Sequence, residues 1–283
     1  MLPKSLFKSP NLRLERPDGA QEEDRAPEVA CPGCKRVCAL ADLERELFVC
    51  SRCGHYHKVG ARDRIRMTLD EGSFRELNTD LTSRDPLAFP GYAGKLMQAR
   101  AQSGEKEAVV TGLGLLEGRP CAFFAMEHAF MMGSMGAAVG EKISRLFERA
   151  LEDRLPVVGF TLSGGARVQE GVLSLMQMAK VSGAVRRHSD VGLFYCAVLC
   201  DATTGGVAAS FAMQADVILA EPGALIGFAG PRVIEQTTRQ KLPEGFQQSE
   251  FQLDKGFVGR LCRRSEQREL LGLLLRMHGE AGK

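Results

Sequence analysis

Two Cys-x2-Cys motifs near the start of the chain constrain its fold more than any other feature. Cys31 and Cys34 form the first motif, Cys50 and Cys53 form the second, and fifteen residues separate them. Each motif presents two thiolates to one side of an ion, and four such ligands make the tetrahedron that Zn²⁺ prefers. A closed set of four ligands is typical of a structural ion, and in so short a segment the metal supplies most of the folding free energy. The spacing therefore predicts a structural four-Cys zinc ribbon.

The surroundings of the ribbon leave its binding partners open. Between residues 31 and 66, eight Lys or Arg stand against four Asp or Glu. This excess fits a solvated face, but it also fits contact with the phosphates of nucleic acid or of a phosphorylated cofactor. Cys38 lies outside the two motifs, and we expect it to be a small packing residue rather than an alternative ligand.

The composition is that of an ordinary globular enzyme. The net charge is +2, 44% of the residues are hydrophobic and 25% are charged, which excludes a heavily basic nucleic-acid packing protein. No apolar run reaches the roughly 18 residues of a membrane span, and no secretory signal is present. We therefore predict a cytoplasmic protein without membrane contact, whose nine cysteines are thiols or metal ligands. Residues 1–28 are polar and are predicted to be a disordered tail.

Beyond residue 109, apolar runs of strand length alternate with helical stretches, which indicates an α/β or mixed core. The runs at 109–116 and 121–126 flank a turn and predict paired strands. The remaining predicted strands are 156–161, 193–199 and 217–220, and the predicted helices are 137–153, 169–186, 207–215 and 267–277.

Two glycine pairs follow predicted strands and precede predicted helices. They are Gly164-Gly165 and Gly205-Gly206. Backbone N–H groups at a helix start are unpaired, and glycine lets a ligand approach them closely, so such turns can hold an oxyanion. Each pair can equally be a tight turn. The segment from Gly133 to Gly136 offers the same two alternatives, phosphate binding or a turn.

Other motifs fail on their spacing. Gly112 and Gly114 lack the third glycine of a dinucleotide-binding turn, and Glu141 stands where a phosphate-binding loop has its lysine. His128 and His188 have no carboxylate or nucleophile at a recognisable spacing, so we assign neither an acid–base role. We expect the cysteines outside the ribbon to be buried packing residues; they are Cys121, Cys196, Cys200 and Cys262.

At this point a series of motifs in matching order resembles the β-subunit family of bacterial acetyl-CoA carboxylase carboxyltransferases. The motifs are the two Cys-x2-Cys pairs and residues 61–65, 130–136, 163–170, 174–178, 203–207, 220–237 and 242–246. The resemblance implies an α/β crotonase-like (ClpP/crotonase) superhelix of ββα units with an N-terminal four-Cys zinc ribbon. It places the ribbon at 29–57 and one carboxyltransferase half, of the N-terminal type, at 58–283.

The resemblance also implies an activity and a site. The family transfers a carboxyl group from carboxybiotin on the biotin carrier protein to the CoA thioester acetyl-CoA, giving malonyl-CoA, the first committed step of fatty acid synthesis. The resemblance places the enolate oxygen of the substrate at Gly205 and Gly206. The same wall of the site would be shaped by Gly164, Gly165 and Ala166. The resemblance also implies candidates for CoA contacts, which are Gly133, Ser134, Met135, Gly136 and Arg232.

The implied partners are a separate carboxyltransferase α subunit in an α2β2 assembly, the biotin carboxyl carrier protein, and biotin carboxylase in the larger complex. Two alternatives stay open at this point. One is a zinc-ribbon protein that binds nucleic acid or regulates, and the other is a carboxyltransferase of the propionyl-CoA type.

Overall fold

One mixed β-sheet organises residues 28–278, the part of the chain that the computed structural model describes. The predicted disordered tail therefore lies, up to residue 27, outside the described residues. The strand order is β10-β8-β7-β6-β5-β4-β3, and β9 pairs with the far end of β7. The bounds are β3 Arg75–Leu77, β4 Val109–Leu116, β5 Arg119–Met126, β6 Val157–Ser163, β7 Tyr195–Thr204, β8 Val217–Ala220, β9 Ile226–Gly227 and β10 Arg260–Leu261.

The sheet changes direction at β5. β4 and β5 form the predicted antiparallel hairpin, whose turn contains Gly118 with a φ of +74°. From β5 through β6 and β7 to β8 the strands run parallel. A parallel neighbour requires a crossover, and the helices α4 (Ala137–Glu152) and α5 (Val172–Asp190) supply it before β6 and β7. The carboxyl ends of these strands consequently share one edge of the sheet.

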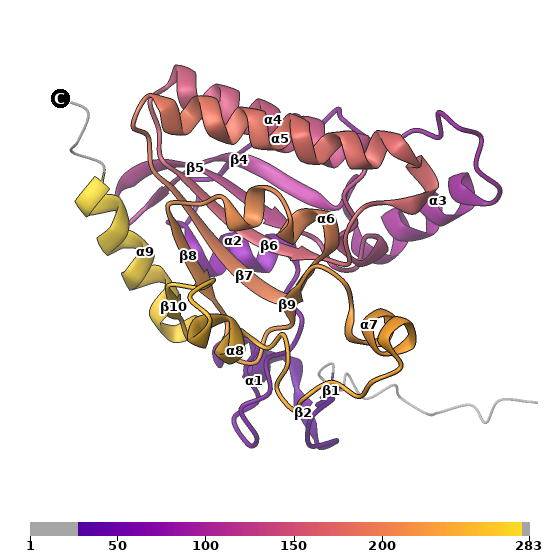
Figure 1. Ribbon diagram of the computed structural model, residues 1–283. Helices are drawn as coiled ribbons and strands as arrows, with labels where there is room; N and C mark the ends of the chain where they lie inside the picture. The colour runs from indigo at the N-terminus through magenta and orange to yellow at the C-terminus, as the bar shows by residue number, and fades with distance from the viewer. Residues whose placement is uncertain (1–27, 279–283) are drawn as a thin grey trace, which may run out of the picture.

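Helices cover both faces of the sheet, as Figure 1 shows. On one face, Phe147 of α4 and Phe124 of β5 both pack against Tyr195 of β7. On the other face, the guanidinium carbon of Arg64 in α2 (Ala61–Thr68) lies 4.8 Å from the ring centroid of Phe160. The ring of Phe160 in turn contacts Phe123. Phe123 and Phe124 are consecutive strand residues, so their side chains point to opposite faces. This explains why β5 is apolar on every residue from Cys121 onward instead of alternating.

The remaining helices lie around this core. Their bounds are α1 Leu40–Arg45, α3 Tyr92–Ser103, α6 Gly205–Ala208, α7 Pro231–Thr238, α8 Ser249–Asp254 and α9 Arg264–His278. Short 3-10 turns are η1 Met131–Gly133, η2 Val168–Glu170 and η3 Phe211–Met213. Within residues 28–278, no helix combines the length and the hydrophobicity that crossing a bilayer requires.

Two predicted helices differ from the structure. The helix expected at 207–215 is wrong as a continuous element, because α6 and η3 are separated at Ser210 (φ −133°, ψ −121°). The Ser210 hydroxyl donates to the carbonyl of Gly206 at 2.5 Å, a local bond of the kind that competes with helix continuation. The helix expected from residue 169 begins only at Val172, because Gly171 (φ +52°, ψ −135°) interrupts it.

The segment before α2 is a small unit with its own core. β1 (Glu28–Ala30) and β2 (Val37–Ala39) form an antiparallel pair, and α1 follows directly. Leu43, Phe48 and Val59 are buried together. So few apolar residues give little burial free energy, which agrees with a unit that needs a metal to fold.

Candidate functional site

The two predicted glycine turns lie against each other at the shared edge of the sheet. Gly164 and Gly165 follow β6, and Gly205 and Gly206 follow β7, its parallel neighbour. A Cβ built on Gly205 would lie 2.8 Å from the Cα of Gly165, closer than real Cβ contacts allow. Both Gly165 and Gly205 also have positive φ, at +111° and +61°. Only glycine fits this contact between two backbones.

Three amides of these turns are already used. Their hydrogen bonds hold each turn to its surroundings, so they cannot also be aimed at a ligand. The bonds run from Gly205 N to Phe228 O at 2.9 Å, from Gly164 N to Met132 O at 2.9 Å, and from Gly165 N to Ser163 Oγ at 3.0 Å.

Two amides of the same turns stay free. Gly206 N lies in the first turn of α6, where helix geometry gives it no partner, and it donates to no other described residue. Ala166 pairs with Met135 in a parallel bridge whose two bonds involve the residues on either side of Ala166. Within residues 28–278 its own N–H has no acceptor. These two N–H groups can receive a developing negative charge.

The third glycine segment packs onto the end of β6. Met131 and Met132 both have positive φ, and a Cβ on Gly133 would lie 2.1 Å from the carbonyl oxygen of Leu162. A Cβ on Gly136 would meet the carboxylate of Glu170 at 2.5 Å. The segment is therefore a tightly fitted turn, and its glycines are required by packing.

A cleft of about 690 Å³ opens beside the first turn. Gly164 and Ala166 line it, together with Ser134 and Met132. The face of α3 that carries Lys95, Gln98 and Gln102 forms another wall. Of the predicted site residues in the first turn and the third glycine segment, the structure brings Gly164, Ala166 and Ser134 to this cleft. Among the described residues, Gly205, Gly206 and Arg232 do not line it, and Arg232 is exposed on α7.

A buried arginine forms the floor beneath the cleft. The side chain of Arg167 is fully buried, and it donates to Glu107 Oε1 at 2.7 Å and to the carbonyl of Ser134 at 2.7 Å. It also donates to the hydroxyls of Ser83 at 2.7 Å and Ser134 at 3.1 Å. Glu170 lies 3.6 Å from it and accepts from the N–H of Ala137 at the start of α4. Arg167 thus fixes the Ser134 segment to the first turn.

Electrostatics favour the charged forms of Arg167 and Glu107. Burial opposes ionisation of Glu107, but the charge and hydrogen bond of Arg167 outweigh burial and lower the pKa of Glu107 below its ordinary value. Sequence reasoning assigned no role to Glu107, Arg167 or Glu170. Arg167 and Glu170 were visible only as members of a motif, and the sequence offers no sign that Glu107 pairs with Arg167.

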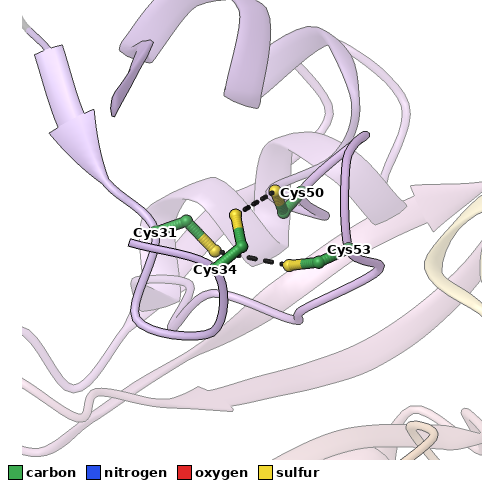
Figure 2. Close-up of side chains that lie close together, drawn as sticks. All are labelled: Cys31, Cys34, Cys50 and Cys53. Carbon is green, nitrogen blue, oxygen red and sulfur yellow. Dashed lines mark hydrogen bonds between the residues drawn. The ribbon is translucent and has the colours of Figure 1, made fainter. Parts of the chain in front are cut away.

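The four ribbon cysteines converge on one point, as Figure 2 shows. Their sulfurs all lie within 4.8 Å of one another, with Cys31 and Cys53 3.6 Å apart and Cys34 and Cys50 3.9 Å apart. A tetrahedron with Zn–S distances of about 2.3 Å places its sulfurs about 3.8 Å apart. The donor set therefore fits a tetrahedral soft metal. Cys38 points elsewhere and donates to the carbonyl of Val29 at 3.4 Å.

A second buried arginine ties the ribbon to the large domain. Arg264, at the start of α9, donates to the ribbon carbonyls of Phe48 and His57, both at 2.9 Å. The same guanidinium binds Glu221 through two bonds of 2.8 Å. Arg64 binds Glu221 from the other side at 2.8 Å. Burial opposes ionisation of Glu221, yet its two arginine partners lower its pKa to about 2.

The cysteines outside the ribbon and His188 lie in the interior. Cys121, Cys196, Cys200 and Cys262 are buried, as predicted. His188 is buried with Nε2 2.9 Å from the carbonyl of Leu155, which agrees with a structural histidine.

Comparisons with known proteins agree on one family. A family model described as the carboxyl transferase domain matches residues 57–248. The acetyl-coenzyme A carboxylase carboxyl transferase subunit beta of Ruminiclostridium cellulolyticum is 52% identical, over 98% of this chain and 98% of the relative.

Solved structures share the fold. Transcarboxylase 12S, with methylmalonyl-coenzyme A and methylmalonic acid bound, has a TM-score of 0.67 and 28% identity over 77% of this chain. This chain spans only 41% of that transcarboxylase chain. A Pseudomonas malonate decarboxylase hetero-tetramer in complex with malonate has a TM-score of 0.62 and 26% identity, covering 84% of this chain and 87% of the other. The predicted crotonase-like fold with a four-Cys ribbon is confirmed.

Proposed function

This chain belongs to the carboxyl transferase family, and from that premise we propose that its active site lies where the two glycine turns meet. The predicted function, the carboxyltransferase β subunit of acetyl-CoA carboxylase, is confirmed by the relative at 52% identity over 98% of both chains. Carboxybiotin on a carrier protein supplies the carboxyl group, and acetyl-CoA accepts it to give malonyl-CoA. The observation that carries the site is the pair of free amides at the contact between the turns.

The amides of Gly206 and Ala166 are the proposed donors to the thioester oxygen. Removing a proton beside a thioester puts negative charge on that oxygen, and fixed N–H groups stabilise the charge without having to reorganise. Each well-aimed donor contributes about 3 kcal/mol. The amides of Gly164, Gly165 and Gly205 have a structural role, because their hydrogen bonds hold the two turns in shape. No nucleophilic side chain is needed for this chemistry.

The segment from Gly133 to Gly136 is the proposed wall against which CoA lies. Ser134 lines the cleft, and Arg167 holds its backbone and its hydroxyl. Gly133, Met135 and Gly136 are buried, so they shape this wall from behind. Arg232 stands outside the cleft lining, and its CoA contact stays a prediction.

An apolar face beside the cleft is the proposed contact with a second carboxyltransferase half. Val168, Val172, Leu175 and Met176 are 74%, 64%, 55% and 59% exposed, and their spacing puts them on one side of η2 and α5. Val168 and the exposed Met132 also line the cleft. Contiguous exposed apolar side chains are typical of a protein interface.

The chemistry and the lengths of the related chains support an identity for that partner. This chain spans 41% of the transcarboxylase chain, and a related malonate decarboxylase is a hetero-tetramer. We infer an α subunit that closes the cleft in an α2β2 assembly. The biotin carboxyl carrier protein delivers the carboxyl group to this cleft, and biotin carboxylase recharges the carrier in the larger complex.

Zn²⁺ is the proposed occupant of the four-Cys site. Four thiolates at tetrahedral spacing leave no open position, so the ion supports structure and takes no part in the chemistry. Nucleic-acid contact at the basic ribbon stays a prediction, as does a cytoplasmic location.

The assay that tests the proposal combines the purified chain, its α subunit, carboxybiotin and acetyl-CoA. We expect malonyl-CoA from the mixture and none from either chain alone. A mixture that forms a complex but makes no malonyl-CoA contradicts the proposal. Replacing acetyl-CoA by propionyl-CoA tests the alternative substrate, and a higher kcat/KM for propionyl-CoA would favour it.

A further inference from the structure

The strand that carries the second glycine turn is interrupted by a bulge. Thr161 of β6 pairs with Leu199 of β7, but Ser163 pairs with Thr203, so two steps along β6 match four along β7. Before the bulge β7 pairs with β8, and after it β7 pairs with β9. The bulge, residues 200–202, therefore stands directly before the residues that lead into Gly205.

Asp201 holds this bulge to the next segment of chain. Its Oδ1 accepts from the N–H of Leu225 at 3.1 Å, and the carbonyl of Leu225 accepts from the N–H of Thr203 at 2.9 Å. Asp201 therefore links the bulge to Leu225, the residue that precedes β9. Through Thr203 the same contact reaches the last residues before Gly205 and Gly206.

Lys58, which follows the ribbon, binds Asp201 through its side-chain ammonium. Its Nζ lies 2.6 Å from Asp201 Oδ2 and also donates to the backbone carbonyl of Asp201. The backbone on either side of Lys58 is fixed. The carbonyl of His57 accepts from Arg264 at 2.9 Å, and Val59 is buried in the ribbon core. Lys58 thus connects two well-anchored regions that lie far apart in the sequence.

We propose that Lys58 is a positioning residue for the carboxyl transfer reaction, which holds the Asp201 bulge in register so that Gly205 and Gly206 meet the first glycine turn. The proposal rests on the proposed function of that turn. It gives the ribbon a task beyond its own stability, because the docked ribbon sets the place of Lys58.

The small contribution of this ion pair to stability makes a positioning role distinguishable from a structural one. The side chains of Lys58 and Asp201 are each 43% exposed, and exposed pairs contribute little to global stability. Loss of the pair should therefore leave the melting temperature almost unchanged. Displacement of a catalytic group by about 1 Å can nevertheless reduce a rate on the order of a hundredfold.

The test compares Lys58→Met with Lys58→Arg and Asp201→Asn. The control is Arg186→Met, which removes an exposed ion pair with Asp190 at the far end of α5. The first measurement is amide hydrogen exchange of Thr203 and Gly205 in the chain alone, so it does not depend on activity. We expect exchange about tenfold faster in Lys58→Met and Asp201→Asn, and unchanged exchange in Lys58→Arg and Arg186→Met.

The second measurement is kcat and KM of the complex with its α subunit. We expect kcat to fall about tenfold or more in Lys58→Met with a small change in KM, and to recover in Lys58→Arg. Wild-type exchange and wild-type kcat in folded Lys58→Met would overturn the proposal. Faster exchange with no malonyl-CoA even from the wild-type complex would instead refute the proposed function and leave the coupling standing.

Discussion

Two buried arginines, Arg167 and Arg264, make the same kind of contact in two regions of the molecule. Each binds a buried carboxylate and also donates to backbone carbonyls of a segment that it holds in place. Arg167 holds the Ser134 segment at the cleft. Arg264 holds the ribbon at Phe48 and His57.

The difference lies in what supports the held segment. The cleft segment rests on the large core, since Phe130 and Met135 on either side of it are fully buried. The ribbon has a small core of its own and depends on its metal and on the Arg264 contact. Damage to the ribbon should therefore leave the sheet folded and reach the site only through Lys58, whereas damage at Arg167 should reach the site directly.

Metal removal should have the largest effect on folding, and the unfolding should stay within the ribbon. Structural zinc sites bind with about 10–16 kcal/mol, which becomes folding free energy. We expect the double change Cys31→Ala and Cys34→Ala to abolish metal binding and to expose residues 28–57 to proteolysis. Metal analysis and limited proteolysis measure this.

The matched control is Cys38→Ser, which changes a ribbon cysteine outside the cluster. It should keep one metal ion per chain. An intact, protease-resistant ribbon in the metal-free double variant would show that the two regions do not differ as described.

Arg167→Met should have the next largest effect. It leaves Glu107 and Glu170 buried without their cation, and breaking a buried pair costs about 3–5 kcal/mol of unfolding free energy. Urea unfolding measures the loss. The control Arg145→Met removes an exposed pair with Glu141 and should cost less than about 1 kcal/mol. Equal losses of unfolding free energy in the two variants would show that the buried contacts of Arg167 add nothing to stability.

Acid should weaken the contact beneath the ribbon. The pKa of Glu221 falls from 4.5 to about 2 in the folded chain. A lowered pKa stabilises the fold at neutral pH, and this contribution, roughly 3 kcal/mol, is lost as the pH falls from about 4.5 toward 2. Unfolding free energies measured across this range should decline less in Glu221→Gln than in wild type. Parallel declines of the unfolding free energy in the two proteins would refute the lowered pKa of Glu221.

Val172→Lys on the apolar face should have the smallest effect on folding, within about 0.5 kcal/mol, because the side chain is exposed. Assembly with the α subunit should nevertheless weaken, because a charge would enter an apolar interface. Analytical ultracentrifugation measures this. Undiminished assembly would place the partner on another face.

The sequence predicted those parts whose signal is local. β4 and α4 lie almost where their apolar patterns placed them, and the cysteine spacing predicted a cluster that the sulfurs form. The glycine pairs were recognised as turns of possible function. Their contact with each other was not predicted, since it depends on β6 and β7 being parallel neighbours.

The rest depended on distant partners or on weak patterns. Glu107 and Arg167 are brought together only by the fold, as are Lys58 and Asp201. The helix α3 was not predicted, although Gly91 and Gly104, both with positive φ, bound it. The expected helix at 207–215 failed because a serine hydroxyl can replace a helical hydrogen bond, which an apolar pattern does not reveal.

We propose that the contact between the two glycine turns builds the catalytic site. Gly205→Ala tests it, because the new Cβ would meet the Cα of Gly165 at 2.8 Å. Gly192→Ala is the matched control, with a similar φ of +76° but no atom within 4 Å of its Cβ. Steady-state kinetics of malonyl-CoA formation should show kcat reduced on the order of a hundredfold in Gly205→Ala and nearly unchanged in Gly192→Ala. Equal kcat values for the two variants would show that the contact between the turns does not build the catalytic site.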